Sequence, residues 1–554
     1  MERLIRKTVG GLLEDIATKH PFRPAVKYIE ADYSRTYYDF NRDCDDIARG
    51  LLGMGFQKGD KIAVWATNLP EWLILFFATA KIGVILATVN TNYKENELAY
   101  LLENSDSKAI FICDGLKDID CEKIIYSLCP ELKTCDPGRL KTERFPFLTH
   151  VISFDNHYKG MYHWKDIKDF GVLLSDKKFA AAKAAVDPDE VINMQYTSGT
   201  TGLPKGVQLT HFNIVNNGMQ IGDCMKFTDH DRLCIPVPFF HCFGMVLGIM
   251  ACVTHATAMV PLFFYTPMKV MHAIEYEKCT AVHGVPTMFI AILEHRDFNK
   301  YNFSSLRTGI MAGSPCPEPI MRKVIDKMNM REITITYGQT EASPACTMST
   351  VDDDLEHKVT TVGKGLAFQE AKIFEPGTNN ELPAGVSGEF CVKGYNVMKG
   401  YYKMPKATAD TIDAEGWLRT GDMALKTEDG YYKITGRIKD MIIRGGENIF
   451  PKEIEDFLLT HEGVKDAQIV AVPSERYGEE AFAFIVKRAG YESLTEKDIR
   501  KYILDRLARH KVPTYISFIN EFPMTASGKI QKFLLREEAK KLAGASGTLI
   551  DFKD

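Results

Sequence analysis

A short stretch at residues 196–206 constrains this chain more than any other, because it combines anion-binding chemistry with a break in regular structure. Within residues 197–206 stand four hydroxyl side chains, three glycines and one lysine. Glycines let a backbone turn and expose its N–H groups, hydroxyls add donors, and a lysine supplies a charge suited to phosphate. The preceding residues 191–195 lean apolar and predict a short strand. The pattern therefore predicts a strand and then a loop that holds a polyphosphate; the alternative is a flexible surface turn.

The spacing of this loop differs from the common nucleotide-binding patterns. A Walker loop needs a glycine, four residues and then Gly-Lys-Ser/Thr. Counting from Gly199 places Pro204 where the second glycine should stand, and Gly206 follows Lys205 instead of preceding it. The stretch also lacks the Gly-x-Gly-x-x-Gly fingerprint of dinucleotide-binding folds. Both patterns are therefore disfavoured.

Length, charge and cysteine usage exclude several other classes. A chain of 554 residues exceeds what one core usually holds, so two or more domains are expected. A net charge of −5 gives no basic surface for nucleic acid. The 13 cysteines include no Cys-x-x-Cys pair, and no signal peptide is visible, which predicts free thiols in a reducing cytoplasm. Polar residues interrupt the apolar runs 72–89 and 245–264, so we expect buried core helices leading into strands and no integral membrane segment.

Helical and strand patterns alternate in the first part of the chain. Helix-period segments at residues 12–18 and 39–54 exchange with apolar runs at residues 61–65, 84–89 and 109–113. This alternation predicts an α/β fold with a largely parallel sheet. Further on, residues 360–435 are rich in strand and turn signals, and residues 440–554 read as a compact α+β unit. The expected fold is a large N-terminal multi-sheet α/β domain with a small α+β C-terminal domain.

Three further segments carry chemistry. Tyr337 and Glu341 follow the expected strand 333–336, where open α/β sheets place ligands; the carboxylate suits magnesium and the aromatic ring suits a purine. The alternative is a polar turn with a solvated glutamate. Asp422 follows a turn and suits two ribose hydroxyls, and Arg437, fifteen residues on, suits the same sugar; the alternative is a surface salt bridge. Lys529 stands on a glycine-bearing loop, where a lysine is more often solvated than catalytic.

The order of these segments resembles the core motifs of the adenylate-forming superfamily. That superfamily covers acyl- and aryl-CoA synthetases, peptide-synthetase adenylation domains and beetle luciferases. Residues 284–287, 312–315, 388–390 and 444–451 are also similar to it, so the resemblance covers about residues 10–540. The chain looks most similar to the medium-chain fatty acyl-CoA synthetases. The resemblance implies an adenylation domain at residues 1–438 and a mobile C-terminal domain at residues 439–554.

The resemblance also implies a role for each matching residue. The loop would hold the β- and γ-phosphates of ATP through Thr197, Ser198, Gly199, Thr200, Thr201 and Lys205. The adenine would lie against Gly313, Ser314, Pro315, Tyr337 and Gly338. Thr340 would touch the α-phosphate, Glu341 would bind Mg²⁺, Asp422 and Arg437 would hold the ribose, and Lys529 would lie between the carboxylate and the α-phosphate.

The second substrate is expected to be CoA. In the family the C-terminal domain rotates about the position of Lys439 and brings in a loop that matches Gly445, Gly446 and Glu447. Only 25 residues follow Lys529, too few for a fused carrier domain, so free CoA is the expected thiol. The phosphates of CoA could be held by four cations near the end of the chain, Lys532, Arg536, Lys540 and Lys541. The alternative is that these four residues form a solvated basic face of a helix.

The acid substrate is expected to lie against the apolar segment 239–253 with His241, which stands where related acyl-CoA synthetases often have histidine. No aspartate for an amino group stands in residues 239–244, so amino acids are disfavoured. Cys242 beside His241 is not expected to form a catalytic pair, because neighbours in a strand point to opposite sides. We expect an AMP-forming acyl-CoA synthetase for a medium- or long-chain fatty acid. Alternatives are an aryl-CoA ligase, an acyl-AMP ligase or luciferase-like enzyme, and a non-catalytic nucleotide-binding protein; peripheral membrane contact and a homodimer stay open.

Overall fold

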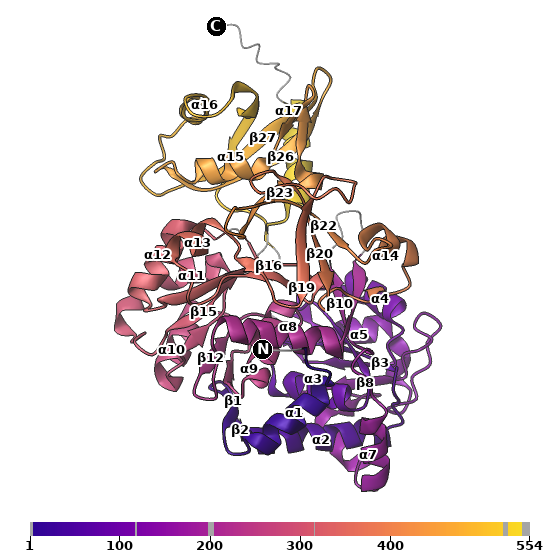
Figure 1. Cartoon of the computed structure of the whole chain (residues 1–554). Helices are drawn as coiled ribbons and strands as arrows, with labels where there is room; N and C mark the ends of the chain where they lie inside the picture. Colours follow the sequence, from indigo (N-terminus) through magenta and orange to yellow (C-terminus); the bar gives the residue numbers. More distant parts are fainter. Residues whose placement is uncertain (1–3, 117–118, 198–203, 315, 525–529, 546–554) are drawn as a thin grey trace. The chain divides into compact units, whose positions relative to one another are not determined.

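The computed structural model describes residues 4–116, 119–197, 204–314, 316–524 and 530–545 (Figure 1). Contacts divide the chain into two compact units, of which the first holds residues 1–371 and 392–418 and the second holds residues 372–391 and 419–554. The two-domain α/β fold expected from the sequence is confirmed. The predicted domain boundary between residues 438 and 439 is a hinge position, which is a different property from a boundary between compact units, so it stays a prediction.

An eight-stranded sheet in the first unit carries the predicted phosphate loop. Its order is β21-β11-β10-β4-β3-β5-β8-β9. The strands from β10 to β9 run parallel, and β11 runs antiparallel to both neighbours, so the carboxyl ends of β10, β4 and β3 meet at one edge. The bounds are β3 (Lys61–Trp65), β4 (Ile85–Thr88), β5 (Ala109–Ile112), β8 (His150–Ser153), β9 (Tyr162–His163), β10 (Val191–Thr197), β11 (Lys205–Thr210) and β21 (Gly400–Tyr401).

A nine-stranded sheet in the same unit carries the predicted purine and magnesium residues. Its order is β18-β17-β16-β15-β14-β12-β13-β1-β2, parallel from β16 to β1 and antiparallel at both ends. The bounds are β1 (Pro24–Tyr28), β2 (Tyr33–Thr36), β12 (Arg232–Ile235), β13 (Ala258–Pro261), β14 (Ala281–Val282), β15 (Thr308–Ala312), β16 (Glu332–Gly338), β17 (Ala345–Met348) and β18 (Lys364–Gly365). A short hairpin, β6 (Gly115–Leu116) with β7 (Ile119–Asp120), lies apart from both sheets.

Helices between the strands complete the parallel crossovers of this unit. They are α1 (Val9–Lys19), α2 (Tyr37–Gly53), α3 (Pro70–Lys81), α4 (Glu95–Ser105), α5 (Cys121–Leu128), α6 (Ile167–Phe170), α7 (Asp176–Ala184), α8 (His211–Cys224), α9 (Ala251–Thr254), α10 (Pro267–Glu277), α11 (Pro286–Leu293), α12 (Glu318–Lys327), α13 (Leu355–Thr360) and α14 (Pro405–Thr411). The first predicted apolar run forms α3, which contacts α1, α2 and β4 and is buried nearly all round. Its last residue, Lys81, is fully buried and pairs with Glu14 and Asp45, each at 2.9 Å. Two carboxylates are thus what allow a charge at the end of a core helix.

The second apolar run forms a π-helix, η3 (Phe243–Met250), which continues through α9 into β13. Every residue of η3 is buried, and the helix contacts α8. Both runs are therefore core helices leading into strands, as the sequence predicts. A search of the described residues finds no helix long and apolar enough to cross a membrane.

The second unit is built around a five-stranded sheet of order β25-β24-β27-β26, with β28 paired to β27. Its strands are β24 (Ile442–Arg444), β25 (Glu447–Ile449), β26 (Val464–Ser474), β27 (Gly478–Lys487) and β28 (Tyr515–Phe518), and its helices are α15 (Pro451–Leu458), α16 (Glu496–Leu504) and α17 (Lys532–Ala545). A capping box begins α16, since Thr495 and Asp498 exchange hydrogen bonds there. A four-stranded sheet has the order β19 (Gln369–Phe374), β20 (Gly388–Gly394), β22 (Leu418–Lys426) and β23 (Tyr432–Arg437).

Candidate active site

The predicted phosphate loop closes the hairpin of β10 and β11. Thr197 and Lys205 stand opposite each other in the last register pair, and both side chains are half-buried. Because β10 runs parallel to β4, Thr197 ends its strand at the edge where open α/β sheets place ligands. The predicted strand is confirmed. Ser198, Gly199, Thr200 and Thr201 lie outside the described residues, so their contacts stay predictions.

A short acidic turn follows β16, as predicted. The 3₁₀ turn η5 (Thr340–Ala342) buries Thr340 and leaves the Glu341 side chain half-buried. Two bonds to a neighbouring segment hold the turn: the Met398 N–H donates to the Glu341 carbonyl at 2.8 Å, and the Ser343 hydroxyl donates to the Asn396 carbonyl at 2.6 Å. Glu341 therefore projects from a backbone that is fixed on both sides.

Tyr401 joins the acidic turn to the phosphate hairpin, and sequence reasoning missed it. Its phenol donates to Glu341 Oε1 at 2.8 Å, and its ring centroid lies 4.6 Å from Lys205 Nζ. The structure thus brings Lys205 and Glu341, which are 136 positions apart in the numbering, to the same tyrosine. The signal that existed was weak: Tyr401 belongs to a glycine-containing segment that reads as an ordinary turn.

The predicted adenine segments lie side by side at the ends of two parallel strands. Ala312 pairs with Thr336, so Gly313 and Ser314 leave β15 beside Tyr337 and Gly338 of β16. Gly313 has a φ of 89°, which favours glycine. A Cβ on Gly338 would lie 1.9 Å from the Pro344 carbonyl oxygen, so a side chain does not fit there. Pro315 lies outside the described residues.

His241 stands just before the π-helix η3. Its Nδ1 accepts the Phe243 N–H at 3.1 Å, which places the ring proton of the neutral histidine on Nε2. Asn68 holds the approach to His241, because its side chain bonds the Val237 carbonyl at 3.0 Å and the Phe239 N–H at 2.8 Å. The expectation that Cys242 lies in a strand was wrong: Cys242 caps the helix in an αR conformation.

A second histidine near the acyl-pocket segment, His283, is fully buried and was not found from the sequence. Its Nε2 lies 2.9 Å from the Leu247 carbonyl of η3, and its Nδ1 accepts the Ile310 N–H of β15 at 3.2 Å. Burial lowers the pKa of His283 to about 4, so the ring is neutral near pH 7. His283 therefore links the acyl-pocket helix to the strand that leads to the adenine segment.

The predicted ribose residues form a pair in the second unit. Asp422 and Arg437 are register partners of β22 and β23, and Arg437 Nε donates to Asp422 Oδ1 at 2.7 Å. The pairing that the sequence suggested is thus present, although Asp422 lies within β22 and not at the end of a turn. Glu389 supports the segment by accepting the Gly421 N–H at 3.2 Å.

The predicted hinge lies directly after this pair. Lys439 is exposed in the 3₁₀ turn η6 (Ile438–Asp440), and the next residue, Asp440, pairs with Arg536 of α17. Lys529 lies outside the described residues, so its role stays a prediction. The other cations proposed for CoA face carboxylates: Lys532 lies 2.7 Å from Glu455, and Lys540 and Lys541 lie near glutamates of their own helix. These pairs favour the reading of a solvated helix face.

The predicted CoA loop is the tight turn of the β24–β25 hairpin. Gly445 and Gly446 have φ values of 58° and 91°, and Glu447 is exposed. Arg444 anchors the hairpin, since its Nε lies 2.7 Å from the buried Glu480 carboxylate. The turn thus presents two glycines on a rigid base.

Glu341 has the features of a magnesium ligand. Magnesium takes oxygen ligands, keeps several waters and is usually bound through one or two carboxylates together with substrate phosphates. One oxygen of the half-buried Glu341 carboxylate accepts the Tyr401 phenol, which restricts the orientation of the carboxylate. A single well-held carboxylate therefore fits an ion that arrives with ATP.

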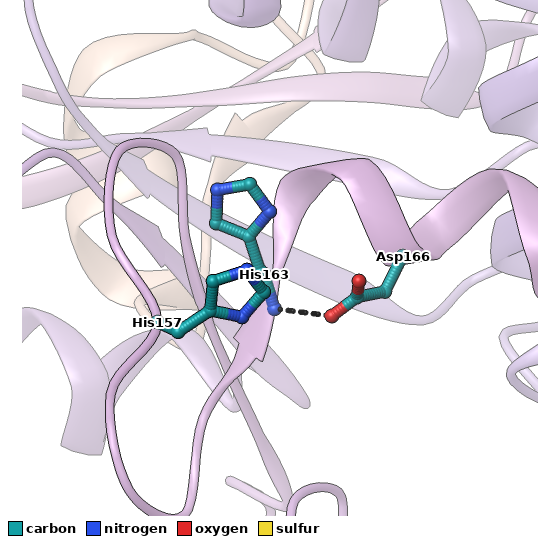
Figure 2. A group of neighbouring side chains, drawn as sticks. All are labelled: His157, His163 and Asp166. Atoms are coloured by element: carbon teal, nitrogen blue, oxygen red, sulfur yellow. Dashed lines mark hydrogen bonds between the residues drawn. The ribbon is translucent and has the colours of Figure 1, made fainter.

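Among the residues that the structure describes, one group of three side chains lies close enough together to hold a metal ion, namely His157, His163 and Asp166 (Figure 2). The two imidazole rings stack with their centroids 4.2 Å apart and 28° between their planes. The nitrogen lone pairs lie in the ring planes, so stacked rings do not direct them at one point between the rings. His163 Nδ1 already accepts the backbone N–H of Lys165, and the Asp166 carboxylate accepts the backbone N–H of His163. His163 and Asp166 form the capping box of the 3₁₀ turn η2 (Trp164–Asp166), and we assign no metal to the group.

The chain is similar to known proteins over nearly its whole length. Residues 13–402 match the family described as AMP-binding enzyme, and residues 453–529 match its C-terminal domain. YngI of Bacillus subtilis, which carries a provisional name as an acyl-CoA synthetase, is 51% identical over 549 residues, 99% of this chain and 100% of its own. The mouse medium-chain acyl-CoA ligase ACSF2 is 40% identical, covering 97% of this chain and 88% of its own. The crystal structure of ATP-bound MatB from Rhodopseudomonas palustris superposes with a TM-score of 0.83 at 27% identity, over 96% of this chain and 99% of MatB.

Proposed function

The chain belongs to the AMP-binding enzyme family and is an ATP-dependent, AMP-forming acyl-CoA synthetase, for which we propose a medium- or long-chain fatty acid as the substrate. The observation that carries the proposal is the identity of 40–51% over nearly the whole chain with proteins named as acyl-CoA synthetases or ligases. The apolar, buried surroundings of His241 support the choice of a fatty acid.

In the first half-reaction an oxygen of the acid attacks the α-phosphorus of ATP, an acyl–oxygen–phosphorus bond forms, and pyrophosphate leaves. Two anions must approach, so positive charge and donors are needed where negative charge crowds. We assign Lys205 and the hydroxyls of residues 197–201 to the β- and γ-phosphates, Thr340 to the α-phosphate, and Lys529 to the space between the reacting carboxylate and phosphorus. Magnesium held by Glu341 would neutralise phosphate charge when bound.

The rest of the nucleotide is assigned to two further groups of residues. Gly313, Ser314, Pro315 and the Tyr337–Gly338 pair would hold adenine, because Tyr337 offers an aromatic face to a purine. Asp422 is nearly buried and would accept the two ribose hydroxyls, with Arg437 beside it. These roles follow from the family motifs and agree with the local geometry.

In the second half-reaction the sulfur of CoA attacks the acyl carbonyl, a thioester forms, and AMP leaves with the electron pair of the broken carbon–oxygen bond. We propose that the chain turns at Lys439 between the two steps and presents Gly445, Gly446 and Glu447 to the thiol. Closure about a few residues of this kind commonly separates successive steps of one site.

The acid pocket is proposed to lie along residues 239–253 with His241 at its mouth. The π-helix η3 supplies an apolar wall, and residues 239–244 contain no carboxylate that would recognise an amino group. The name of the mouse relative, a medium-chain acyl-CoA ligase, supports a medium chain. A pocket separates homologues by only about 1–3 kcal/mol per methylene, so chains that differ by one methylene should differ in kcat/KM by about 10–200-fold at most.

One screen tests the proposed function. AMP release is measured with ATP, Mg²⁺ and CoA across short, medium and long fatty acids, aryl acids and dicarboxylic acids. The expected result is a maximum in kcat/KM at a medium or long fatty acid. A maximum at an aryl acid would contradict the proposed substrate, and adenylate formation without any CoA thioester would instead indicate an acyl-AMP ligase or a luciferase-like enzyme.

The cellular setting is also a proposal. All 13 cysteines lie among the described residues and are free thiols, which supports the cytoplasm as the compartment. An acyl-CoA product partitions into bilayers, so peripheral contact with a membrane would suit the reaction. Fractionation of cells with an antibody to the chain tests both points.

A further inference from the structure

Tyr401 lies between two oppositely charged groups that the proposed reaction uses separately. The Lys205 ammonium stands over one side of the ring, at 4.6 Å from its centroid, and the Glu341 carboxylate accepts the phenol at 2.8 Å. Among the described residues, no ion pair joins Lys205 to Glu341. The three residues belong to the first unit, so their geometry is internal to one compact body.

The backbone around Tyr401 leaves the ring little freedom. β21 pairs with β11, where Val207 stands opposite Tyr401, and the Tyr401 N–H donates to the Thr408 hydroxyl at 2.9 Å. The residue is 7% exposed. Because β11 also carries Lys205, the lysine and the tyrosine are fixed on adjacent strands of one sheet.

The phenol remains a proton donor under ordinary conditions. A tyrosine phenol ordinarily carries its proton near pH 7, and the Tyr401 phenol donates that proton to Glu341 Oε1. A neutral phenol therefore binds one carboxylate oxygen of Glu341 without neutralising its charge. A lysine in that place would neutralise it.

The position of Tyr401 bears on how Lys205 and Glu341 can both reach the nucleotide in the proposed reaction. A lysine on its flexible stem and a nearby carboxylate attract each other, and a mutual ion pair would withdraw both from the nucleotide. A neutral aromatic ring attracts the ammonium through its face and the carboxylate through its hydroxyl, at two separate places. We propose that Tyr401 is a positioning residue that keeps Lys205 and Glu341 apart, so that the ammonium meets phosphate oxygens and the second Glu341 oxygen meets magnesium. The inference rests on the proposed function and adds to it a residue that touches neither substrate.

Equilibrium binding separates this role from the chemistry. ATP binding is measured by calorimetry over a series of Mg²⁺ concentrations, without fatty acid or CoA, for the wild-type chain and for Tyr401→Phe, which keeps the ring and removes the donor. We expect Tyr401→Phe to weaken Mg²⁺-dependent ATP binding about tenfold, the scale of one hydrogen bond to a charged group, and to raise the Mg²⁺ concentration at half-effect. Binding in the absence of Mg²⁺ should change by less than about twofold.

The adjacent tyrosine provides a matched control. The Tyr402 phenol donates to Asp106 at 2.7 Å, and its ring lies 4.9 Å from Lys61 Nζ, so it has the same kinds of partner away from Glu341. Tyr402→Phe should therefore bind ATP as the wild type does at every Mg²⁺ concentration. Equal effects of Tyr401→Phe and Tyr402→Phe would overturn the proposal and leave a general packing role.

A double-mutant cycle tests whether Tyr401 acts through Glu341. In a Glu341→Gln background, Tyr401→Phe should add less than about twofold to the loss of Mg²⁺-dependent binding. Independent, additive losses would overturn the proposal, as would a Tyr401→Phe variant with wild-type Mg²⁺ dependence. All four proteins are compared below their thermal midpoints, so a drop in stability does not enter the cycle. A wild-type chain that binds ATP with Mg²⁺ but activates no fatty acid would contradict the proposed function alone.

Discussion

Arg437 Nε donates to Asp422 Oδ1 at 2.7 Å, although the aspartate side chain is only 5% exposed and the arginine side chain is 56% exposed. A salt bridge between exposed groups contributes little to stability, so the interest of this pair lies in its buried member. A nearly buried carboxylate keeps its charge only with donors around it, and ribose hydroxyls would supply two more.

Asp422→Asn should therefore weaken ATP binding more than it weakens the fold. We expect KM for ATP to rise about tenfold, because an amide accepts hydrogen bonds less strongly than a carboxylate does. KM for the acid should stay the same. The control is Glu381→Gln, which removes another ion-paired carboxylate of the second unit, 2.9 Å from Lys372, and should change neither constant. Equal changes in both KM values for Asp422→Asn would contradict the ribose assignment.

Lys529→Ala should impair the first half-reaction. Loss of one well-placed charge in a transition state lowers the rate by about 10²–10³-fold. ATP–pyrophosphate exchange measures this step directly. Lys532→Ala is the control, because Lys532 pairs with Glu455 at 2.7 Å and should affect exchange little. Exchange at the wild-type rate in Lys529→Ala would remove Lys529 from the mechanism.

The residues proposed to contact ligands were easier to predict than the residues that position them. Thr197, Lys205, Glu341 and Asp422 belong to short segments whose glycines, hydroxyls and charges stand together in the sequence, so each segment indicates its own chemistry. The paired strands around them could also be predicted, since β-branched and apolar runs alternate with turn residues. The acidic turn after β16 and the pairing of Asp422 with Arg437 were predicted in this way.

The supporting residues depend on contacts between distant parts of the chain. Tyr401 meets Glu341 across 60 positions, and Asn68 bonds Phe239 across 171 positions, so no local pattern marks either residue. The helix in this apolar run was predicted but its π-helical form was not, because an entirely apolar run has no period that distinguishes one helix type from another. His283 looked like any core histidine. Contacts of this kind are set by tertiary packing alone.

The pKa of His283 predicts a pH dependence of stability. The pKa is about 4 in the folded chain and 6.5 as an ordinary histidine, so the unfolded chain binds more protons between these values. The unfolding free energy should therefore fall as the pH drops below about 6.5, and the contribution of His283 to this fall should end near pH 4. Between pH 7 and pH 5, His283 alone accounts for about 2 kcal/mol of unfolding free energy.

His283→Gln isolates this contribution, because glutamine offers a donor and an acceptor but does not titrate. Urea unfolding is followed by tryptophan fluorescence, which reports on the first unit, where Trp65, Trp72, Trp164 and Trp417 all lie. The variant should lose about 2 kcal/mol less than the wild type between pH 7 and pH 5. The exposed His272→Gln serves as control and should follow the wild type. Identical pH dependence in wild type and His283→Gln would mean that folding does not lower the pKa of His283.

Lys439→Pro tests the proposed turn of the chain between the two half-reactions. A proline fixes its own φ near −65° and restricts the residue before it, so the η6 segment would lose the freedom to change its backbone angles. Adenylation needs one arrangement and thioester formation needs a second, so a frozen segment should spare the first step and slow the second.

The measurement is a pair of rates: ATP–pyrophosphate exchange for adenylation, and single-turnover transfer from preformed acyl-adenylate to CoA for the thioester step. We expect transfer to fall at least about tenfold more than exchange does, because hinge changes act on the step that needs the motion. Lys439→Ala, which removes the charge and keeps the backbone free, is the matched control and should affect the two steps alike. If Lys439→Pro slows both steps equally, the segment does not act as a hinge, and the boundary at residue 438 loses its functional meaning.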